Sequence, residues 1–153
     1  MSRVTCHLSV SLDGFIGGPD QSLDYPVGVG GGLAWLVGDD PPYHGPVFVL
    51  TNHEHDSIEM SGGTTFHFVT GGFQAGLDRA KEAAGDRDVR IAGGASTVRQ
   101  ALAANAIDDI WFDIIPVALG SGETIFEGPP SSTFTQLEVT HSTTYAHLHY
   151  RVG

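Results

Sequence analysis

The sequence predicts an α/β fold with a mainly parallel central sheet flanked by helices, and with an antiparallel hairpin at its C-terminal end. Between residues 46 and 117, short apolar runs with strand character alternate with amphipathic helical runs. That order is typical of parallel strands joined by crossover helices. Two glycines, Gly93 and Gly94, stand directly between one such strand and the next helix. Two runs that alternate polar and apolar residues, separated by a short turn, close the chain and indicate the hairpin.

Length and composition limit the possible classes of protein. A chain of 153 residues fits one domain, residues 1–153, and can bury a real core. No apolar run approaches the roughly 20 residues of a membrane span, and the N-terminus lacks the pattern of a signal peptide. The single Cys6 cannot form an internal disulfide. We therefore expect a cytoplasmic protein that does not enter a membrane. The net charge of −11, with only seven Lys and Arg residues, argues against nucleic acid as a partner.

The first half of the chain predicts three strands and a long loop. Residues 3–10 alternate polar and apolar side chains, and the run from Ser11 to Gly14 ends that pattern as a turn. Residues 17–38 are too rich in glycine for a regular element, apart from a short helical fragment at 33–37. The apolar run at 46–51 has the length of a buried parallel strand, and residues 64–69 predict another.

The second half predicts two helices, two strands and the hairpin. Residues 73–84 and 96–104 each place apolar side chains at helical spacing, so each predicts a helix with one face against the sheet. The strands predicted between and after them cover residues 89–92 and 107–117. Residues 133–141 and 144–152 predict an antiparallel hairpin at the sheet edge.

The turn at Gly93 and Gly94 has the layout of a phosphate site. Glycine has no side chain to hold a ligand away, so backbone N–H groups can approach a pyrophosphate. A helix that begins near Ser96 adds unpaired N–H groups and the positive end of its dipole. The alternative is an ordinary tight turn in which Ser96 caps the helix.

Four segments in this order resemble the dihydrofolate-reductase-like superfamily. They are similar in particular to the small stand-alone relatives of the riboflavin biosynthesis reductase domain. The segments are residues 9–17 (SVSLDGFIG), 49–52 (VLTN), 92–97 (AGGAST) and 114–126 (IIPVALGSGETIF). The resemblance implies a dihydrofolate-reductase-like fold and an NADP(H)-dependent reductase of a small heterocyclic, or related carbonyl or imine, substrate.

The resemblance also implies which residues hold the cofactor. Ser9, Ile16 and Gly17 match the positions that face the nicotinamide. Leu50, Thr51 and Asn52 match the strand end that holds the adenosine ribose and its 2′-phosphate. The residues that match the pyrophosphate turn and the segment after it are Gly93, Gly94, Ala95, Ser96, Thr97 and Thr124.

The chain departs from the family in one place. Members carry a strand and a helix with a Gly-Arg-x-Thr motif, which grips the cofactor phosphates, before the strand at Pro46. Here that segment is absent between about residues 37 and 39, and nothing in the run from Trp35 to Tyr43 matches it. Either the segment has been lost, which would weaken NADP binding, or a stretch of the natural chain is missing from the sequence. We favour the second explanation, because such a sheet cannot lose a strand and a helix without exposing its core.

Two acidic residues are the candidates for a catalytic role. Asp13 could orient its loop or contact cofactor or substrate, but Asp-Gly is also a common turn pair. Asp113 lies in an apolar strand, opposite the face of Phe112 and Ile114. If it points into a cleft, it could bind an amino-pyrimidine or pterin-like ring, or relay a proton with a raised pKa. If it does not, it faces solvent or forms a salt bridge.

Metal binding and partners complete the sequence-based expectations. The pairs His53/His55 and His147/His149 would each place two imidazoles on one face of a strand, but neither completes a known metal motif, so we expect no metal. A small-molecule substrate is the expected ligand. Unpaired strand edges near Ile114 or in the hairpin favour a homodimer. The rival to a reductase is a non-catalytic binding or assembly module that keeps the same fold.

Overall fold

The computed structural model describes residues 2–18, 43–127 and 132–153. It divides into two compact units, of which one holds Met1–Ser2 and Leu33–Val89 and the other Arg3–Gly32 and Arg90–Gly153. The predicted fragment at 33–37, Trp35 and the break expected between 37 and 39 lie outside the described residues. The single domain expected for residues 1–153 stays a prediction.

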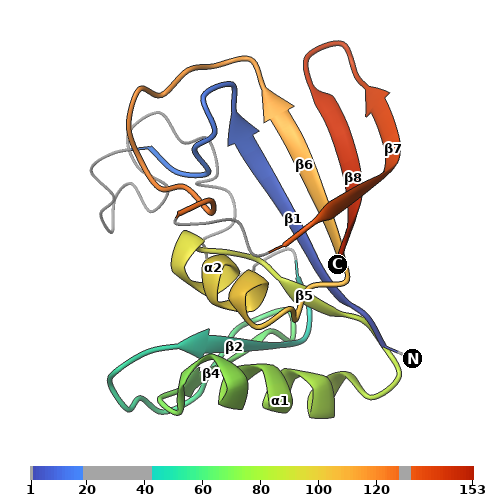
Figure 1. Cartoon of the computed structure of the whole chain (residues 1–153). Helices are drawn as coiled ribbons and strands as arrows, with labels where there is room; N and C mark the ends of the chain where they lie inside the picture. The colour runs from blue at the N-terminus through green and yellow to red at the C-terminus, as the bar shows by residue number, and fades with distance from the viewer. Residues whose placement is uncertain (1, 19–42, 128–131) are drawn as a thin grey trace. The chain divides into compact units, whose positions relative to one another are not determined.

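The larger unit is built on a five-stranded sheet with the order β5-β1-β6-β8-β7. Its strands are β1 (Val4–Ser11), β5 (Val89–Ile91), β6 (Asp109–Ile115), β7 (Phe134–His141) and β8 (Ala146–Val152). β1 pairs parallel with β6, whereas β8 pairs antiparallel with both β6 and β7. Figure 1 shows β7 and β8 as the hairpin that closes this sheet, which confirms the predicted C-terminal hairpin at a sheet edge.

The core of this unit follows from strand alternation. Every second residue of β1, from Val4 to Val10, is buried, and the residues between them are more exposed. Burial raises the pKa of the Cys6 thiol to about 12, so Cys6 acts as a small apolar core residue. The helix α2 (Ala95–Ala103) buries one stripe at three- and four-residue spacing, formed by Ala95, Val98, Ala101 and Leu102.

The smaller unit is a three-stranded sheet and one helix. β2 (Pro46–Leu50) pairs parallel with β4 (Thr65–Val69), and β3 (Ile58–Glu59) pairs antiparallel with β4. The helix α1 (Gly72–Ala84) lies against β2 and β4 (Figure 1). Gly76 permits this approach, because a Cβ at that position would overlap the side chain of Leu50.

The structure confirms the mixed α/β class, with two helices, the C-terminal hairpin and strands that form a five-stranded and a three-stranded sheet. Three details differ from expectation. The second helix begins at Ala95 rather than Ser96, because Gly94 is its N-cap and no side chain caps it. The short strand β3 was not predicted, since two residues cannot show an alternating pattern. His53 and His55 lie in an irregular segment after β2 and not on a strand. Among the residues described, no helix is long and apolar enough to span a membrane.

Candidate functional site

The turn between β5 and α2 places backbone N–H groups at an open surface. Gly93 has a φ of +128°, which a residue with a side chain rarely adopts, and Gly94 is extended as the N-cap of α2. Among the residues that the structure describes, no atom lies within 4 Å of a Cβ added at Gly93 or at Gly94. None of these residues therefore fills the space beside the two glycines. Ser96 is exposed in the first turn of α2, where the helix leaves N–H groups without intrahelical partners.

A second group of predicted residues lies where two loops meet in the same unit. The N–H of Ile16 donates to the carbonyl of Glu123 at 2.8 Å, and the N–H of Glu123 donates to the carbonyl of Gly17 at 3.0 Å. This pair of bonds forms an antiparallel bridge between the loop after β1 and the loop after β6. Ile16 and Gly17 therefore have fixed backbone positions. Ser9 precedes them on β1 and is half-buried.

Arg99 joins the loop after β6 to the helix that begins at the glycine turn. Its guanidinium donates to the carbonyl of Thr124 at 2.7 Å and forms an ion pair with Glu127 at 3.2 Å. The hydroxyl of Thr124 accepts a hydrogen bond from the N–H of Phe126 at 3.2 Å. The predicted residue Thr124 is thus tied to α2 through its backbone, while its hydroxyl stabilises a local turn.

Asp13 lies on the loop after β1, with its carboxylate directed at the loop after β6. The N–H of Leu119 donates to Oδ1 at 3.0 Å, and the N–H of Gly120 donates to Oδ2 at 2.7 Å. The hydroxyl of Ser11 also donates to Oδ1, at 2.6 Å. These bonds, led by that from Ser11, lower the pKa of Asp13 to about 2. The carboxylate is therefore ionised at every physiological pH.

Asp113 lies between two imidazoles on one face of the five-stranded sheet. Its Oδ2 is 2.8 Å from Nε2 of His7, and its Oδ1 is 2.6 Å from Nδ1 of His147. Burial raises the pKa of Asp113, but the hydrogen bonds and charges of His147 and His7 outweigh it, and the pKa lies below its ordinary value. The raised pKa considered for a proton relay is therefore wrong, because both neighbours favour the carboxylate. Its side chain is 24% exposed and remains accessible.

The same sheet face carries a second carboxylate and imidazole pair. Asp109 is buried and lies 3.1 Å from both Nη1 of Arg3 and Nε2 of His149. The ring of His149 stacks on Trp111, with 4.0 Å between the ring centroids. His147 and His149 thus share one face of β8, as predicted, but they bind two different carboxylates. Among the residues described, no group of three or more His, Cys, Asp or Glu side chains has the arrangement to hold a metal ion.

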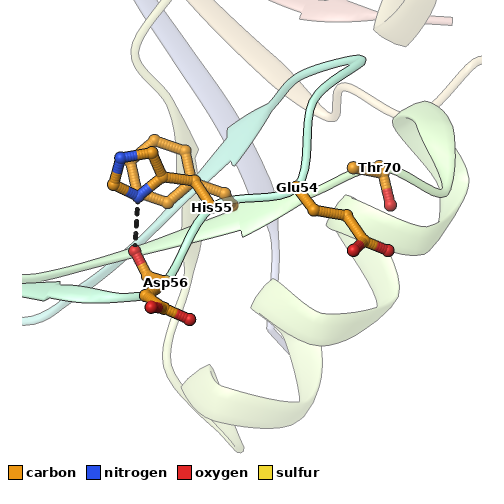
Figure 2. A pocket seen from close by; sticks show the side chains of 5 residues that line it. Glu54, His55, Asp56 and Thr70 are labelled. Atoms are coloured by element: carbon orange, nitrogen blue, oxygen red, sulfur yellow. Dashed lines mark hydrogen bonds between the residues drawn. The ribbon is translucent and has the colours of Figure 1, made fainter.

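Leu50, Thr51 and Asn52, which the resemblance assigns to the adenosine end of the cofactor, belong to the smaller unit. The N–H of Thr51 donates to the carbonyl of Val69 at 3.1 Å. The hydrogen bonding between β2 and β4 therefore extends one residue beyond the end of β2, to Thr51. An open depression of about 570 Å³ lies in this unit. Figure 2 shows Glu54, His55, Asp56 and Thr70 around it, and the fifth lining residue is Phe68. The ring centroids of His55 and Phe68 are 4.6 Å apart.

Sequence reasoning missed two residues that shape the larger unit, namely Ser11 and Asp109. Ser11 and Asp13 stand two residues apart in a predicted turn, and a polar side chain in that position commonly bonds to a nearby group. That spacing was an available signal. The partners of Arg99 and Asp109 come from distant parts of the chain, so no local pattern indicates them.

The chain combines a glycine turn before a helix, two bridged loops and an α/β architecture. Comparison with protein-family models shows which family has this combination. Residues 44–148 match the model of the RibD C-terminal domain. The chain therefore belongs to the RibD C-terminal domain family. A comparison with curated protein sequences finds no match.

Solved structures with related names share the fold. A proposed riboflavin biosynthesis protein from Shewanella sp. PV-4 is 19% identical with a TM-score of 0.71, and the match covers 99% of each chain. The riboflavin biosynthesis reductase Rib7 of Saccharomyces cerevisiae is 16% identical with a TM-score of 0.56, covering 99% of this chain and 89% of that one. A diaminohydroxyphosphoribosylaminopyrimidine deaminase/5-amino-6-(5-phosphoribosylamino)uracil reductase from Thermotoga maritima is 16% identical with a TM-score of 0.60, covering 98% and 56%.

Proposed function

We propose that this chain is an NADP(H)-dependent reductase of a small heterocyclic, or related carbonyl or imine, substrate. The observation that carries the proposal is the open glycine turn at Gly93 and Gly94 ahead of α2, in a chain of the RibD C-terminal domain family. The names of the structural relatives support the reaction class, since two of them are described as reductases. Their names do not identify the substrate of this chain.

The glycine turn fits the pyrophosphate of such a cofactor. A pyrophosphate needs converging N–H donors and room for its oxygens. The absent side chains at Gly93 and Gly94 leave that room, and the first turn of α2, with Ala95, Ser96 and Thr97, supplies the donors. The helix dipole adds only about 0.3–1 kcal/mol, so directed backbone hydrogen bonds must supply most of the binding.

When bound, the cofactor supplies the hydride, and the protein positions it against the acceptor. Ser9, Ile16 and Gly17 would hold the nicotinamide ring. The bonds between Ile16, Gly17 and Glu123 support this assignment, because they fix the backbone on which the ring would rest. A rigid support reduces the cost of aligning two reacting groups.

Asp113 is the proposed contact to the substrate. Each of its oxygens already accepts one hydrogen bond from an imidazole, which leaves lone pairs for paired N–H donors of a heterocycle. The lowered pKa favours this binding role over proton donation. Once a substrate is found, we expect Asp113→Asn to lower turnover more than cofactor affinity. Equal losses of turnover and of cofactor affinity would contradict a role for Asp113 in the reaction.

Leu50, Thr51 and Asn52 are proposed to contact the adenosine ribose and its 2′-phosphate. Because the carboxylates of Glu54 and Asp56 lie nearby, the affinities for NADPH and for NADH should be compared. Carboxylates accept hydrogen bonds from a free ribose hydroxyl, whereas they repel a phosphate in its place. Thr124 is also a proposed cofactor contact, and the bond from Arg99 to its carbonyl fixes its backbone.

Calorimetric titration of the intact protein with NADPH and with NADH tests the proposal without knowledge of the substrate. The decisive variant is Ser96→Asp, which places a carboxylate in the first turn of α2, where it would stabilise the helix but repel the pyrophosphate. Gln100→Asp is the matched control, since it adds the same charge one turn later on the same helix. We expect binding in the low micromolar range that is lost in Ser96→Asp and kept in Gln100→Asp.

Absence of binding by either nucleotide would refute the reductase proposal. That result would favour the rival, a non-catalytic binding or assembly module with the same fold. Equal weakening by Ser96→Asp and Gln100→Asp would mean that the phosphates bind elsewhere. The cytoplasmic location and the homodimer expected from the sequence stay predictions. The unpaired edge expected near Ile114 is wrong, because β6 pairs with β1 on one side and with β8 on the other.

A further inference from the structure

We infer that Asp13 is a positioning residue whose carboxylate holds the loop at 117–123 against the loop at 12–17, and so fixes the backbone on which the nicotinamide is proposed to rest. The inference concerns a role for Asp13 in cofactor binding, and in that respect it depends on the proposed function. The contacts that carry it are made between residues of the chain itself.

Backbone hydrogen bonds join the two loops at the two ends of their contact. Near β1 and β6, the N–H of Leu12 donates to the carbonyl of Val117 at 2.8 Å. At the far end, Ile16 and Gly17 are bonded to Glu123. Between these two places, the second loop is held by the side chain of Asp13.

The loop offers Asp13 an anion site made of backbone groups. The N–H groups of Leu119 and Gly120 follow one another, and both point at the carboxylate, with donor to acceptor distances of 3.0 and 2.7 Å. Gly120 has a φ of +76°, the left-handed conformation in which successive N–H groups converge on an anion. An ionised carboxylate is an acceptor only, so its two oxygens match two donors.

Ser11 orients this carboxylate. Its hydroxyl donates to Asp13 at 2.6 Å and accepts from the N–H of Phe15 at 3.0 Å. The Ser11 residue is 2% exposed, so its hydroxyl is held in place by the surrounding core. The side chain of Asp13 is exposed to solvent, yet it is fixed by a buried neighbour on one side and by the second loop on the other.

This arrangement assigns Asp13 to positioning and not to proton transfer. A proton donor needs a pKa near the working pH, whereas three hydrogen bonds stabilise the charged form of Asp13. Asp13→Asn is the sharpest variant, because it keeps the shape but replaces one acceptor oxygen by an NH₂ group that would face an N–H donor. Ser11→Ala removes the orienting bond but leaves both bonds to the second loop, so its effect should be smaller.

Hydrogen exchange of the cofactor-free protein tests the contact between the loops directly. In Asp13→Asn, we expect the amides of residues 117–122 to exchange at least about five-fold faster, because their local opening becomes easier. Ser11→Ala should give an intermediate increase. Asp86→Asn is the matched control, since Asp86 is exposed in the other unit and should leave these amides unchanged. Unchanged exchange in Asp13→Asn, with the fold intact by circular dichroism, would overturn the inference.

Calorimetric titration then tests the consequence for the cofactor. We expect Asp13→Asn to weaken NADPH or NADH binding by about ten-fold, the effect of losing one charge-assisted hydrogen bond. With a substrate in hand, the shape of the pH profile should be retained, because no titrating group is lost. Faster exchange with unchanged affinity would overturn the positioning role. If the wild-type protein binds neither nucleotide, the proposed function and the role toward the cofactor both fail, and exchange still decides whether Asp13 holds the loop.

Discussion

Replacing Gly122 by alanine should destabilise the protein far more than the same change at Gly120, two residues earlier in the same loop. The two glycines share a positive φ, of +143° at Gly122 and +76° at Gly120, so both substitutions strain the backbone. They differ in surroundings. In the part of the chain that the structure describes, a Cβ at Gly120 would meet no atom within 4 Å, whereas a Cβ at Gly122 would overlap the carbonyl oxygen of Gly17.

The expected magnitudes follow from this difference. Alanine at Gly120 is destabilised by the left-handed backbone conformation, and this loss is partly offset because alanine makes the unfolded chain less flexible. The net loss in the free energy of unfolding is about 1 kcal/mol. Alanine at Gly122 enters a region that is nearly restricted to glycine, at about 1–3 kcal/mol. Relieving the overlap would also break the bond from the Glu123 N–H to Gly17, which contributes about 1 kcal/mol. We therefore expect Gly122→Ala to cost about 3 kcal/mol.

Urea denaturation of wild type, Gly120→Ala and Gly122→Ala, followed by circular dichroism, measures both costs. A midpoint for Gly122→Ala well below that of Gly120→Ala, at an unchanged slope, is the expected result. Because Gly17 is a proposed nicotinamide contact, nucleotide affinity should fall in Gly122→Ala as well. Equal free energies of unfolding for the two variants would refute the close approach of the two loops.

Three further outcomes are expected. Ile110 is fully buried in β6, so Ile110→Ala should cost about 3 kcal/mol of unfolding free energy and Ile110→Val about 1 kcal/mol, and equal costs by urea denaturation would contradict a packed core there. Cys6 has a pKa raised to about 12 by burial, so a thiol reagent should modify it only after unfolding, and fast reaction with the native protein would contradict this. Asp113 has a lowered pKa, so its stabilising effect is present above the ordinary carboxyl pKa of about 4 and is lost as the pH falls through the folded value. The stability lost in Asp113→Asn should thus be larger at pH 6 than at pH 3, whereas a pH-independent difference would rule out the charge as its cause.

The helices and the longer strands could be predicted because each carries its own periodicity. The alternation of residues 3–10 gives the buried face of β1, and the helical spacing in residues 73–84 gives α1. Prediction failed where an element is too short to show a periodic pattern of apolar residues, or where its boundary is set by backbone conformation. β3 has only two residues, and α2 begins at Ala95 because the main chain of Gly94 takes the capping position that a hydroxyl was expected to fill.

The candidate site could be predicted only as far as local pattern reaches. Alternation placed Asp113 opposite Phe112, but its partners depend on register, which sets Asp113 beside both Ser9 of β1 and His147 of β8. No spacing within one strand contains that information. The predicted pyrophosphate turn, in contrast, is contiguous from Ala92 to Thr97, so its chemistry could be recognised before the fold was known.

Asp13 shows why a local alternative can be a false choice. From the sequence, a turn role for Asp13 was weighed against a role in orienting the loop or contacting a ligand. In the structure, Gly14 has a φ of +90° and its N–H donates to Ser11, so the turn forms. The same turn directs the Asp13 carboxylate at Leu119 and Gly120, more than a hundred residues further along the chain. Turn formation is therefore the means by which this side chain reaches its distant partners, and a substitution that relaxes the turn, such as Gly14→Val, should loosen residues 117–122 as Asp13→Asn does.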